Sequence, residues 1–249
     1  MANIFKDKLV LVSGAGSGIG KEIALCFAKA GASIAFFDKN SEKVRQVRDE
    51  LENLEVKVVA EVVDVTNNQQ VNAFFETMES EFGSVDVLIN NVGLGLVKRF
   101  FETKDPDFDL VLSTNFKGPF FLTQKVARNM KEGSSIIFIT SIHARHPSLD
   151  PTYDASKAAI NSLVTNLALD LANRGIRVNA VAPGHIDTKS NGVPRAQEDV
   201  PFGKKAGLPA DIAQACLFLA DSVKAHYITG VVLPVTGGLY IPKAADIKL

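Results

Sequence analysis

Short apolar runs alternate with longer stretches of helical periodicity along the whole chain. Helical spacing, with apolar residues three and four positions apart, predicts helices at residues 21–30, 42–53, 69–82, 107–130, 152–173 and 209–219. The apolar runs have the length and the β-branched content of buried strands, and they fall at residues 9–12, 33–37, 56–63, 85–90, 135–140, 177–182 and 231–235.

Strands that alternate with helices predict a parallel sheet with helices on both faces, because each crossover must return the chain to the same edge. We therefore expect an α/β fold, a Rossmann-type doubly wound sheet of seven mainly parallel strands. The sequence contains no repeat, low-complexity stretch or linker, so one domain over residues 1–249 is expected. Residues 184–207 are too long for an ordinary connection. They predict a substrate lid at about residues 185–207.

Composition narrows the classes of partner. The formal net charge is -1, and 22% of the residues are charged without a basic block, which argues against nucleic acid and anionic membranes as partners. No apolar run approaches the roughly 20 residues that span a bilayer, and residues 1–8 lack the apolar core of a signal peptide. We expect a cytoplasmic protein. The two cysteines, Cys26 and Cys216, and the four histidines show no metal-ligand spacing, so we expect buried thiols and no metal.

A glycine-rich turn lies between the first strand and the first helix. It reads Ser13-Gly14-Ala15-Gly16-Ser17-Gly18-Ile19-Gly20. Free backbone N–H groups at a helix N-terminus attract a pyrophosphate, and such a turn lets the backbone approach it closely. A tight turn without a ligand is the alternative. Asp38 follows the second strand, eighteen residues after Gly20, where an acidic residue meets an adenosine ribose.

Asp38 also bears on which dinucleotide binds. Its carboxylate can accept bonds from both ribose hydroxyls of NAD and would repel the 2′-phosphate of NADP. Lys39 is a counter-argument, because a cation beside Asp38 would tolerate phosphate. We predict NAD, with NADP less favoured.

Tyr153 and Lys157 are four residues apart on a predicted helix, so their side chains lie on one face. An ammonium beside a phenol favours the phenolate, which would bring the tyrosine pKa of about 10 towards neutrality. The pair then predicts a general acid/base. Alone it could equally be ordinary helix surface.

The ordered set of motifs resembles the short-chain dehydrogenase/reductase family, in the subfamily of about 250 residues. Besides the glycine turn and the Tyr-x-x-x-Lys pair, the matching motifs are Asp64-Val65, Asn90-Asn91-Val92-Gly93 and Pro183-Gly184-His185-Ile186-Asp187-Thr188. The likeness covers residues 8–238. Within the family, the chain resembles glucose 1-dehydrogenase-like and 3-oxoacyl-acyl-carrier-protein reductase-like members. Val92 stands where the family usually has Ala, and twelve residues separate Ser141 from Tyr153, one fewer than is usual.

The resemblance implies a catalytic tetrad of Asn115, Ser141, Tyr153 and Lys157. Tyr153 would exchange a proton with the substrate oxygen, Ser141 would bind that oxygen, and Lys157 would lower the pKa of Tyr153 and bind the nicotinamide ribose. Asn115 would help to hold a water between Lys157 and solvent. The implied cofactor contacts are Gly14, Ser17, Gly18, Ile19, Asp38, Asp64, Val65, Asn91, Gly93, Tyr153, Lys157, Pro183, Gly184, Ile186 and Thr188.

The expected reaction interconverts a secondary alcohol or a sugar hydroxyl with its carbonyl compound, using NAD(H). Expected substrate contacts are Ser141, His143, Tyr153 and His185, and the lid adds Asn191 and Arg195. So many hydrogen-bonding groups favour a sugar or another polar alcohol. A 3-oxoacyl thioester reductase and a non-catalytic dinucleotide sensor remain alternatives. A homodimer or homotetramer, formed through the helices at residues 107–130 and 152–173, is expected from the resemblance.

Overall fold

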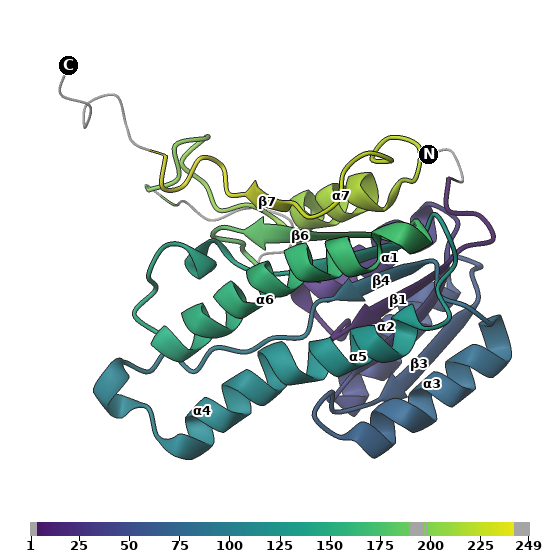
Figure 1. The fold of residues 1–249 in the computed structure, drawn as a ribbon, viewed down its shortest axis with the longest axis horizontal. Helices are drawn as coiled ribbons and strands as arrows, with labels where there is room; N and C mark the ends of the chain where they lie inside the picture. Colours follow the sequence, from purple (N-terminus) through teal and green to yellow (C-terminus); the bar gives the residue numbers. More distant parts are fainter. Residues whose placement is uncertain (1–3, 190–196, 198, 242–249) are drawn as a thin grey trace.

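The chain folds around one seven-stranded sheet. A computed structural model describes residues 4–189, 197 and 199–241 (Figure 1). The strand order is β3-β2-β1-β4-β5-β6-β7, and all neighbouring strands are parallel. The strands are β1 (Leu9–Ser13), β2 (Ser33–Asp38), β3 (Val58–Val62), β4 (Val87–Asn90), β5 (Ser135–Ile139), β6 (Arg177–Pro183) and β7 (Val232–Val235). The predicted doubly wound α/β fold is confirmed.

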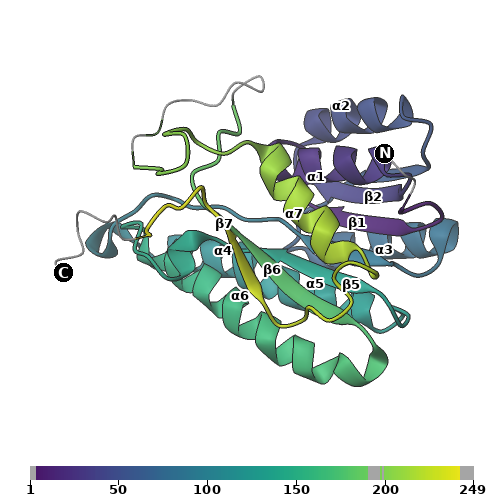
Figure 2. The same cartoon turned by 90° about the horizontal axis from the view of Figure 1, so that it is seen from above.

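Helices cover both faces of this sheet. The helices are α1 (Gly18–Lys29), α2 (Ser41–Glu52), α3 (Asn68–Phe82), α4 (Asp105–Leu112), α5 (Gly118–Ala127), α6 (Pro151–Asp170) and α7 (Pro209–Ala220). Figures 1 and 2 show α1, α2 and α7 on one face and α3, α5 and α6 on the other. Short 3-10 turns lie at Phe100–Glu102, Ile142–Ala144 and Ala172–Arg174.

The central strands are apolar throughout because both of their faces are buried. In β1, Val10 and Val12 pack towards α1 and α7, whereas Leu9 and Leu11 pack towards α3, α5 and α6. All four side chains are at most 4% exposed. This alternation explains why the sequence shows unbroken apolar runs in place of polar alternation.

The structure divides the predicted helix at residues 107–130. α4 ends at Leu112, a π-helical turn spans Ser113–Lys117, and α5 begins at Gly118. A π turn inserts an extra residue into the helical ladder and often marks a functional site. Here it carries Asn115, which is 1% exposed. Apolar periodicity alone does not reveal this turn, because helical spacing continues on either side of it.

The topology places a crevice at the carboxyl ends of β1 and β4. β1 pairs with β2 on one side and with β4 on the other, so the chain reverses its direction of winding between them. Ligands of open α/β sheets bind at such a switch point. Cys26 and Cys216 are buried free thiols on the α1–α7 side, and burial raises the pKa of Cys26 to about 11. Within the described residues, no helix has the length and apolar character needed to cross a membrane.

Candidate active site

The glycine turn forms a tight cradle between β1 and α1. Gly14 and Gly18 adopt positive φ angles of 67° and 58°, which side-chain-bearing residues rarely accept. A Cβ atom on Gly20 would overlap the carbonyl oxygen of Gly14. The Ser17 hydroxyl, at the N-cap of α1, accepts a hydrogen bond from Lys43 Nζ at 3.2 Å in place of capping the helix. The first-turn N–H groups of α1 therefore face the crevice without a side-chain cap from Ser17.

Asp38 lies directly against this cradle. Its Oδ2 accepts a hydrogen bond from Gly16 N at 3.0 Å, and its Oδ1 accepts one from Asn40 N at 3.0 Å. A Cβ atom on Gly16 would come within 2.7 Å of the Asp38 carboxyl carbon. The carboxylate thus lies at the end of β2, one strand away from the strand that leads into the glycine turn.

The cradle and this carboxylate fit a dinucleotide. An uncapped helix N-terminus suits the negative pyrophosphate, and a fixed acceptor beside it suits the ribose hydroxyls. The glycines leave backbone, not side chain, at the surface that such a ligand would touch. A ligand can therefore approach the backbone closely at the glycine positions of the turn.

Asn91 braces the cradle. Its Nδ2 donates to Ser13 O at 3.1 Å and to Gly14 O at 2.8 Å, and its backbone N donates to Ser13 Oγ at 3.0 Å. Asn91, a predicted cofactor contact, therefore also holds the backbone of the glycine turn in place. Asn90 is buried, and its Nδ2 donates to Thr123 Oγ1 of α5 at 2.8 Å, which ties β4 to that helix.

The remaining predicted cofactor residues are spread around the same crevice. Asp64 is exposed and accepts bonds from Thr66, whereas Val65 is buried against Gly118. Gly93 faces Lys157, since a Cβ atom there would lie 3.0 Å from Nζ.

After β6, the chain returns to the glycine turn. Pro183 is the last residue of β6, and Gly184 packs against Thr236 so closely that a Cβ would lie 2.9 Å from its Cα. Ile186 forms a parallel bridge with Gly207, and the Thr188 side chain lies 3.4 Å from the position of a Cβ on Gly18. Residues 183–188 thus border the cradle from the side of β6.

Ser141, Tyr153 and Lys157 converge beside the end of β5. Ser141 follows the strand, and its hydroxyl, near the phenol of Tyr153 on α6, acts to lower the pKa of that phenol. Lys157 lies one turn further along α6, with its Nζ 5.7 Å from the centre of the Tyr153 ring. Its ammonium donates to Ile139 O at 2.9 Å within a buried environment. The sequence prediction that these three side chains share one site agrees with this placement.

Burial perturbs both titratable groups of the site. It lowers the pKa of Lys157 from 10.5 to about 8, because an ammonium loses its hydration there. Burial also raises the pKa of Tyr153, and the nearby Asp154 and Asp150 raise it further, while the Ser141 hydrogen bond opposes them. The sequence predicts that Lys157 lowers the pKa of Tyr153. In the structure the pKa of Tyr153 is raised instead, because the loss of hydration outweighs the lowering by Ser141.

Asn115 links the π turn to the two walls of the site. Its Oδ1 accepts a bond from Leu94 N at 2.8 Å, and its Nδ2 donates to Leu94 O at 2.8 Å and to Ser156 Oγ at 2.9 Å. Its side-chain amide is thus fully engaged with protein. Leu94 belongs to residues 91–99, which we call the β4 loop because they follow β4.

Two of the predicted substrate contacts are histidines above Ser141. The His143 and His185 rings lie 6.5 Å apart, and His143 Nδ1 is hydrogen-bonded to His146 O at 3.0 Å. His146 stacks on Tyr240 at 4.3 Å, so Tyr240 packs against this side of the site. The lid residues Asn191 and Arg195 lie outside the described residues.

The structure has one hollow next to Ser141 and another far from the site. A cavity of about 420 Å³ touches Ser141, Arg145, His146 and Tyr240, but its walls include neither Tyr153 nor His185. It therefore lies beside the reacting groups. A larger hollow of about 820 Å³ lies at the opposite edge of the sheet, next to Lys8 and Asp86, far from the ligand crevice.

The sequence reading missed two residues that hold the site together. Ser156 Oγ donates to Tyr153 O at 2.7 Å and accepts from Asn115. Asp150 is the N-cap of α6 and also binds the β4 loop. An Asp before Pro151 is a readable helix-start signal. Its second set of contacts depends on tertiary placement and has no local signature.

Comparison with known proteins agrees with this geometry. The family described as Enoyl-(Acyl carrier protein) reductase matches residues 14–240. The chain is 39% identical over 241 residues to 7alpha-hydroxysteroid dehydrogenase from Escherichia coli K12, with 93% of each chain covered. It is 37% identical over 245 residues to 3-oxoacyl-[acyl-carrier-protein] reductase from Thermotoga maritima, with 95% of this chain and 99% of the relative covered.

Solved structures give the same picture. A 7 alpha-hydroxysteroid dehydrogenase complexed with NADH and 7-oxo glycochenodeoxycholic acid matches with a TM-score of 0.87 at 36% identity, covering 95% of this chain and 96% of that one. A short chain dehydrogenase from Burkholderia cenocepacia in complex with NADP matches with a TM-score of 0.87 at 30% identity, covering 95% and 99%. These related structures hold different dinucleotides, so likeness alone does not decide between NAD and NADP.

Proposed function

Because the chain belongs to the short-chain dehydrogenase/reductase family, whose members are NAD(P)-dependent oxidoreductases of hydroxyl and carbonyl groups, we propose that Tyr153 is the general acid/base of this reaction. The observation that carries the proposal is the convergence of three side chains: Lys157 Nζ lies 5.7 Å from the centre of the Tyr153 ring, and the Ser141 hydroxyl favours the Tyr153 phenolate. In one direction a secondary alcohol becomes a ketone, and in the other the ketone is reduced.

The proton moves through Tyr153. In the oxidation, the Tyr153 phenolate accepts the proton of the substrate hydroxyl, and in the reduction the phenol returns it. The bound nicotinamide accepts or supplies the hydride. Ser141 hydrogen-bonds the same substrate oxygen and stabilises the charge that develops on it.

Lys157 and Asn115 support this proton transfer. A Lys157 pKa of about 8 lets the amine gain and lose a proton near neutral pH, as a relay to solvent requires. Asn115 fixes Leu94 and Ser156, so it keeps the β4 loop and α6 in register around the reacting groups. We assign it to the same tetrad, as the supporting member.

NAD is the proposed cofactor. Asp38 fixes a negative charge beside the cradle, where it can accept ribose hydroxyls and would repel a 2′-phosphate. Lys43, which reaches Ser17, and Lys39 are the cations that would weaken this preference. The proposed contacts of the cofactor are those predicted from the sequence, with Asn91 acting also as a brace of the turn.

The proposed substrate is a secondary alcohol of mixed polarity. His143 and His185 offer polar contacts near Ser141, and they carry the original preference for a sugar or another polar alcohol. Val97 and Leu149, however, are 86% and 65% exposed beside the Tyr153 helix and offer apolar surface. A ring alcohol with a polar or anionic end satisfies both sets of groups. The hydroxysteroid relative is consistent with that class.

A 3-oxoacyl thioester reductase is the second candidate. It is favoured by the 37% identity to a 3-oxoacyl-[acyl-carrier-protein] reductase. The Asp38 charge argues against it where such an enzyme uses a 2′-phosphorylated cofactor. A dinucleotide sensor without activity is the alternative from another class, and intact Ser141, Tyr153 and Lys157 argue against it.

Four further expectations belong to this proposal. We expect a substrate lid at about residues 185–207, of which residues 190–196 and 198 lie outside the described residues. We expect residues 1–249 to form a single dinucleotide-binding and catalytic domain. The protein forms a homodimer or homotetramer through exposed apolar residues of α4, α5 and α6. Its cytoplasmic location stays a prediction from the sequence.

The decisive experiment is a substrate panel. Aldoses, polyols, hydroxysteroids and 3-oxoacyl thioesters are assayed by nicotinamide absorbance with NAD(H) and with NADP(H). Turnover of a secondary alcohol with a higher kcat/KM for NAD is expected. Turnover of thioesters with NADPH alone would transfer the assignment to the second candidate, and the absence of any turnover together with tight NADH binding would favour the sensor.

A further inference from the structure

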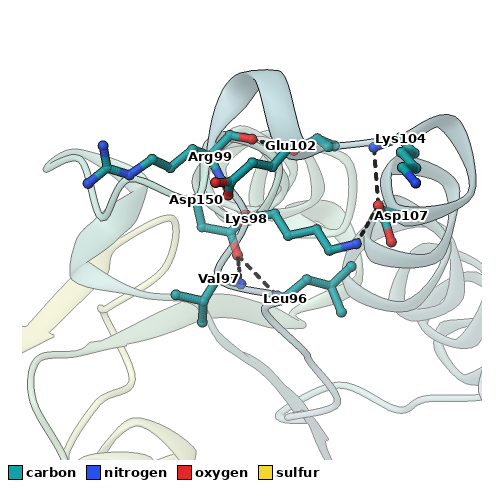
Figure 3. Close-up of polar contacts among 9 residues, drawn as sticks. Leu96, Val97, Lys98, Arg99, Glu102, Lys104, Asp107 and Asp150 are labelled. Atoms are coloured by element: carbon teal, nitrogen blue, oxygen red, sulfur yellow. Dashed lines mark hydrogen bonds and ion pairs between the residues drawn. The ribbon is translucent and has the colours of Figure 1, made fainter.

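Asp150 uses both carboxylate oxygens to join two separate walls of the site. It is the N-cap of α6, and its Oδ1 accepts a bond from Tyr153 N at 3.2 Å. Its Oδ2 accepts bonds from Leu96 N at 3.0 Å and from Val97 N at 2.8 Å, as Figure 3 shows. Asp150 is 5% exposed. A buried carboxylate is costly unless hydrogen bonds satisfy it, and here three N–H groups do so.

A role as helix cap explains only half of these contacts. An N-cap needs one side-chain oxygen to accept a first-turn N–H, and Asn, Ser or Thr supplies that equally well. The second oxygen of Asp150 points away from the helix axis and binds the β4 loop. Only a carboxylate offers acceptors on both sides.

The β4 loop and Tyr153 are tied at two points. Asp150 connects Leu96 and Val97 to the backbone N of Tyr153. Asn115 connects Leu94 to Ser156, whose hydroxyl donates to the backbone O of Tyr153. The backbone of Tyr153 is therefore held through both its donor and its acceptor, each time against the same loop.

The two walls are in direct contact between these ties. A Cβ atom on Gly95 would lie 3.4 Å from Asp150 Oδ2 and 3.4 Å from Tyr153 Cδ2. The loop backbone thus packs on the edge of the Tyr153 ring. Val97 adopts a φ of 55°, which is unfavourable for a β-branched residue, and its N–H is the donor in the 2.8 Å bond to Asp150.

We propose that Asp150 is a positioning residue that fixes the Tyr153 phenol relative to the β4 loop and so sets the opening through which the substrate reaches it. The inference rests on the proposed function of Tyr153 and adds to it a residue outside the tetrad. Loss of the carboxylate should let the β4 loop move away from α6 while the cofactor cradle, at the end of β1, stays intact.

Asp107, in the first turn of α4, provides a matched control because it binds the same loop. It binds Lys98 Nζ at 2.7 Å and Lys104 N at 3.1 Å, so it holds the outer part of the loop to α4 (Figure 3). It makes no hydrogen bond to Tyr153 among the bonds that the structure describes. Asp107→Asn therefore tests the loss of a carboxylate that binds this loop, without loss of the tie to Tyr153.

The test compares Asp150→Asn and Asp150→Ser with Asp107→Asn in the full-length protein. Asn and Ser keep a helix cap, but neither places two acceptors. We expect both Asp150 variants to lower kcat/KM by about tenfold to a hundredfold, chiefly through a higher substrate KM, with NADH affinity within about twofold. Because the Asp150 charge raises the pKa of Tyr153, Asp150→Asn should also move the pH–rate profile to lower pH. Asp107→Asn should stay within about threefold of the parent.

Amide hydrogen exchange supplies a readout that does not depend on turnover. Asp150→Asn should speed exchange in peptides that cover residues 94–99 and leave the glycine turn unchanged. A parent protein without activity would contradict the proposed function. The exchange result would still show whether Asp150 holds the β4 loop against α6. Unchanged kinetics and unchanged exchange in both Asp150 variants would overturn the inference, as would a lower melting temperature with an unaltered KM and pH profile.

Discussion

Tyr153 sits among influences on its protonation that oppose one another. Burial and the neighbouring carboxylates of Asp150 and Asp154 raise its pKa, while the Ser141 hydroxyl stabilises the phenolate. A raised pKa keeps the phenol protonated at neutral pH, which suits proton donation to a ketone. Oxidation of the alcohol needs the phenolate, so its rate should rise with pH.

Tyr153→Phe removes the proton donor and leaves the ring in place. We expect kcat to fall by about 10²- to 10⁴-fold, the usual contribution of general acid–base catalysis. NADH affinity, measured by fluorescence titration, should stay within about threefold. Tyr227→Phe, at a tyrosine that is 92% exposed, is the control and should keep full activity. Full activity of Tyr153→Phe would remove Tyr153 from the mechanism.

Burial of the Lys157 ammonium lowers the stability of the folded protein. Its pKa falls from 10.5 to about 8 in the folded protein, so the unfolded chain binds the proton more tightly. The cost to folding is fully present below pH 8 and disappears as the pH rises from about 8 to 10.5. At about 1.4 kcal/mol per pKa unit, this cost is at most about 3.5 kcal/mol.

Lys157→Met should therefore raise the free energy of unfolding at pH 7 by about 1–3 kcal/mol, after loss of the bond to Ile139 O is counted. The gain should shrink towards pH 10.5, where the parent lysine is neutral in the folded state and only half protonated in the unfolded state. Urea unfolding at pH 7 and pH 10 measures both values. Turnover should be lost in the same variant, and a gain that is equal at the two pH values would contradict the assigned pKa.

Asp38 is the residue on which cofactor choice depends. Asp38→Ser removes the negative charge and keeps a hydrogen-bonding group at the end of β2. We expect kcat/KM for NAD to fall by about tenfold to a hundredfold, the worth of a hydrogen bond to a charged group, and that for NADP to rise. Lys39→Ala, the adjacent control, should leave NAD use within about twofold. Stronger NADP use by the parent than by Asp38→Ser would reverse the argument.

At the scale of elements, the parts of the site follow the carboxyl ends of four strands. The glycine turn follows β1, Asp38 ends β2, the β4 loop follows β4, and Ser141 follows β5. Parallel strands bring these ends to one edge, so a sequence that places polar residues after apolar runs already predicts the site. The doubly wound parallel sheet and the meeting of Ser141, Tyr153 and Lys157 could both be predicted in this way.

Other features were not accessible because they arise only from tertiary packing. The π turn at Ser113–Lys117 lies in a stretch whose spacing reads as one helix. The double role of Asp150 and the bracing by Asn91 depend on backbone groups that are distant in sequence, and backbone groups are the same at every residue. The raised pKa of Tyr153 likewise follows from burial, which a four-residue spacing does not reveal.

The close packing of α1 on the glycine turn gives a test at this scale. Gly20 lies within α1, where Ala would favour the helix, but a Cβ there would overlap Gly14 O and Asn91 Nδ2. Gly20→Ala should therefore displace the turn and weaken NADH binding by tenfold or more, about 1.4 kcal/mol. Lys21→Ala, which removes only an exposed ion pair with Glu50, is the control and should bind NADH normally. Normal binding by Gly20→Ala would show that the turn can shift freely.

At the scale of the whole molecule, apolar side chains gather on the outer helices. Phe108 and Leu110 of α4 are 51% and 47% exposed, and Phe121 of α5 is 46% exposed. Phe101, in the 3-10 turn before α4, is 97% exposed. Figure 1 shows α4 and α5 along the same side of the molecule, in front of the sheet. Large exposed apolar groups in one region are typical of protein–protein interfaces.

This surface predicts self-association. If two copies meet through α4 and α5, light scattering at micromolar concentration should give the mass of a dimer or tetramer, since a symmetric pair buries the same residues on both partners. Phe108→Asp combined with Phe121→Asp would place charges in the interface and should shift the protein to smaller species. Val223→Asp, at a residue that is 79% exposed after α7, is the control for added charge and should leave assembly through α4 and α5 unchanged. Because the π turn with Asn115 joins these two helices, the double variant should also lower kcat/KM if assembly steadies the site. A monomeric parent with full activity would refute the oligomer and show that one copy of the chain holds a complete site.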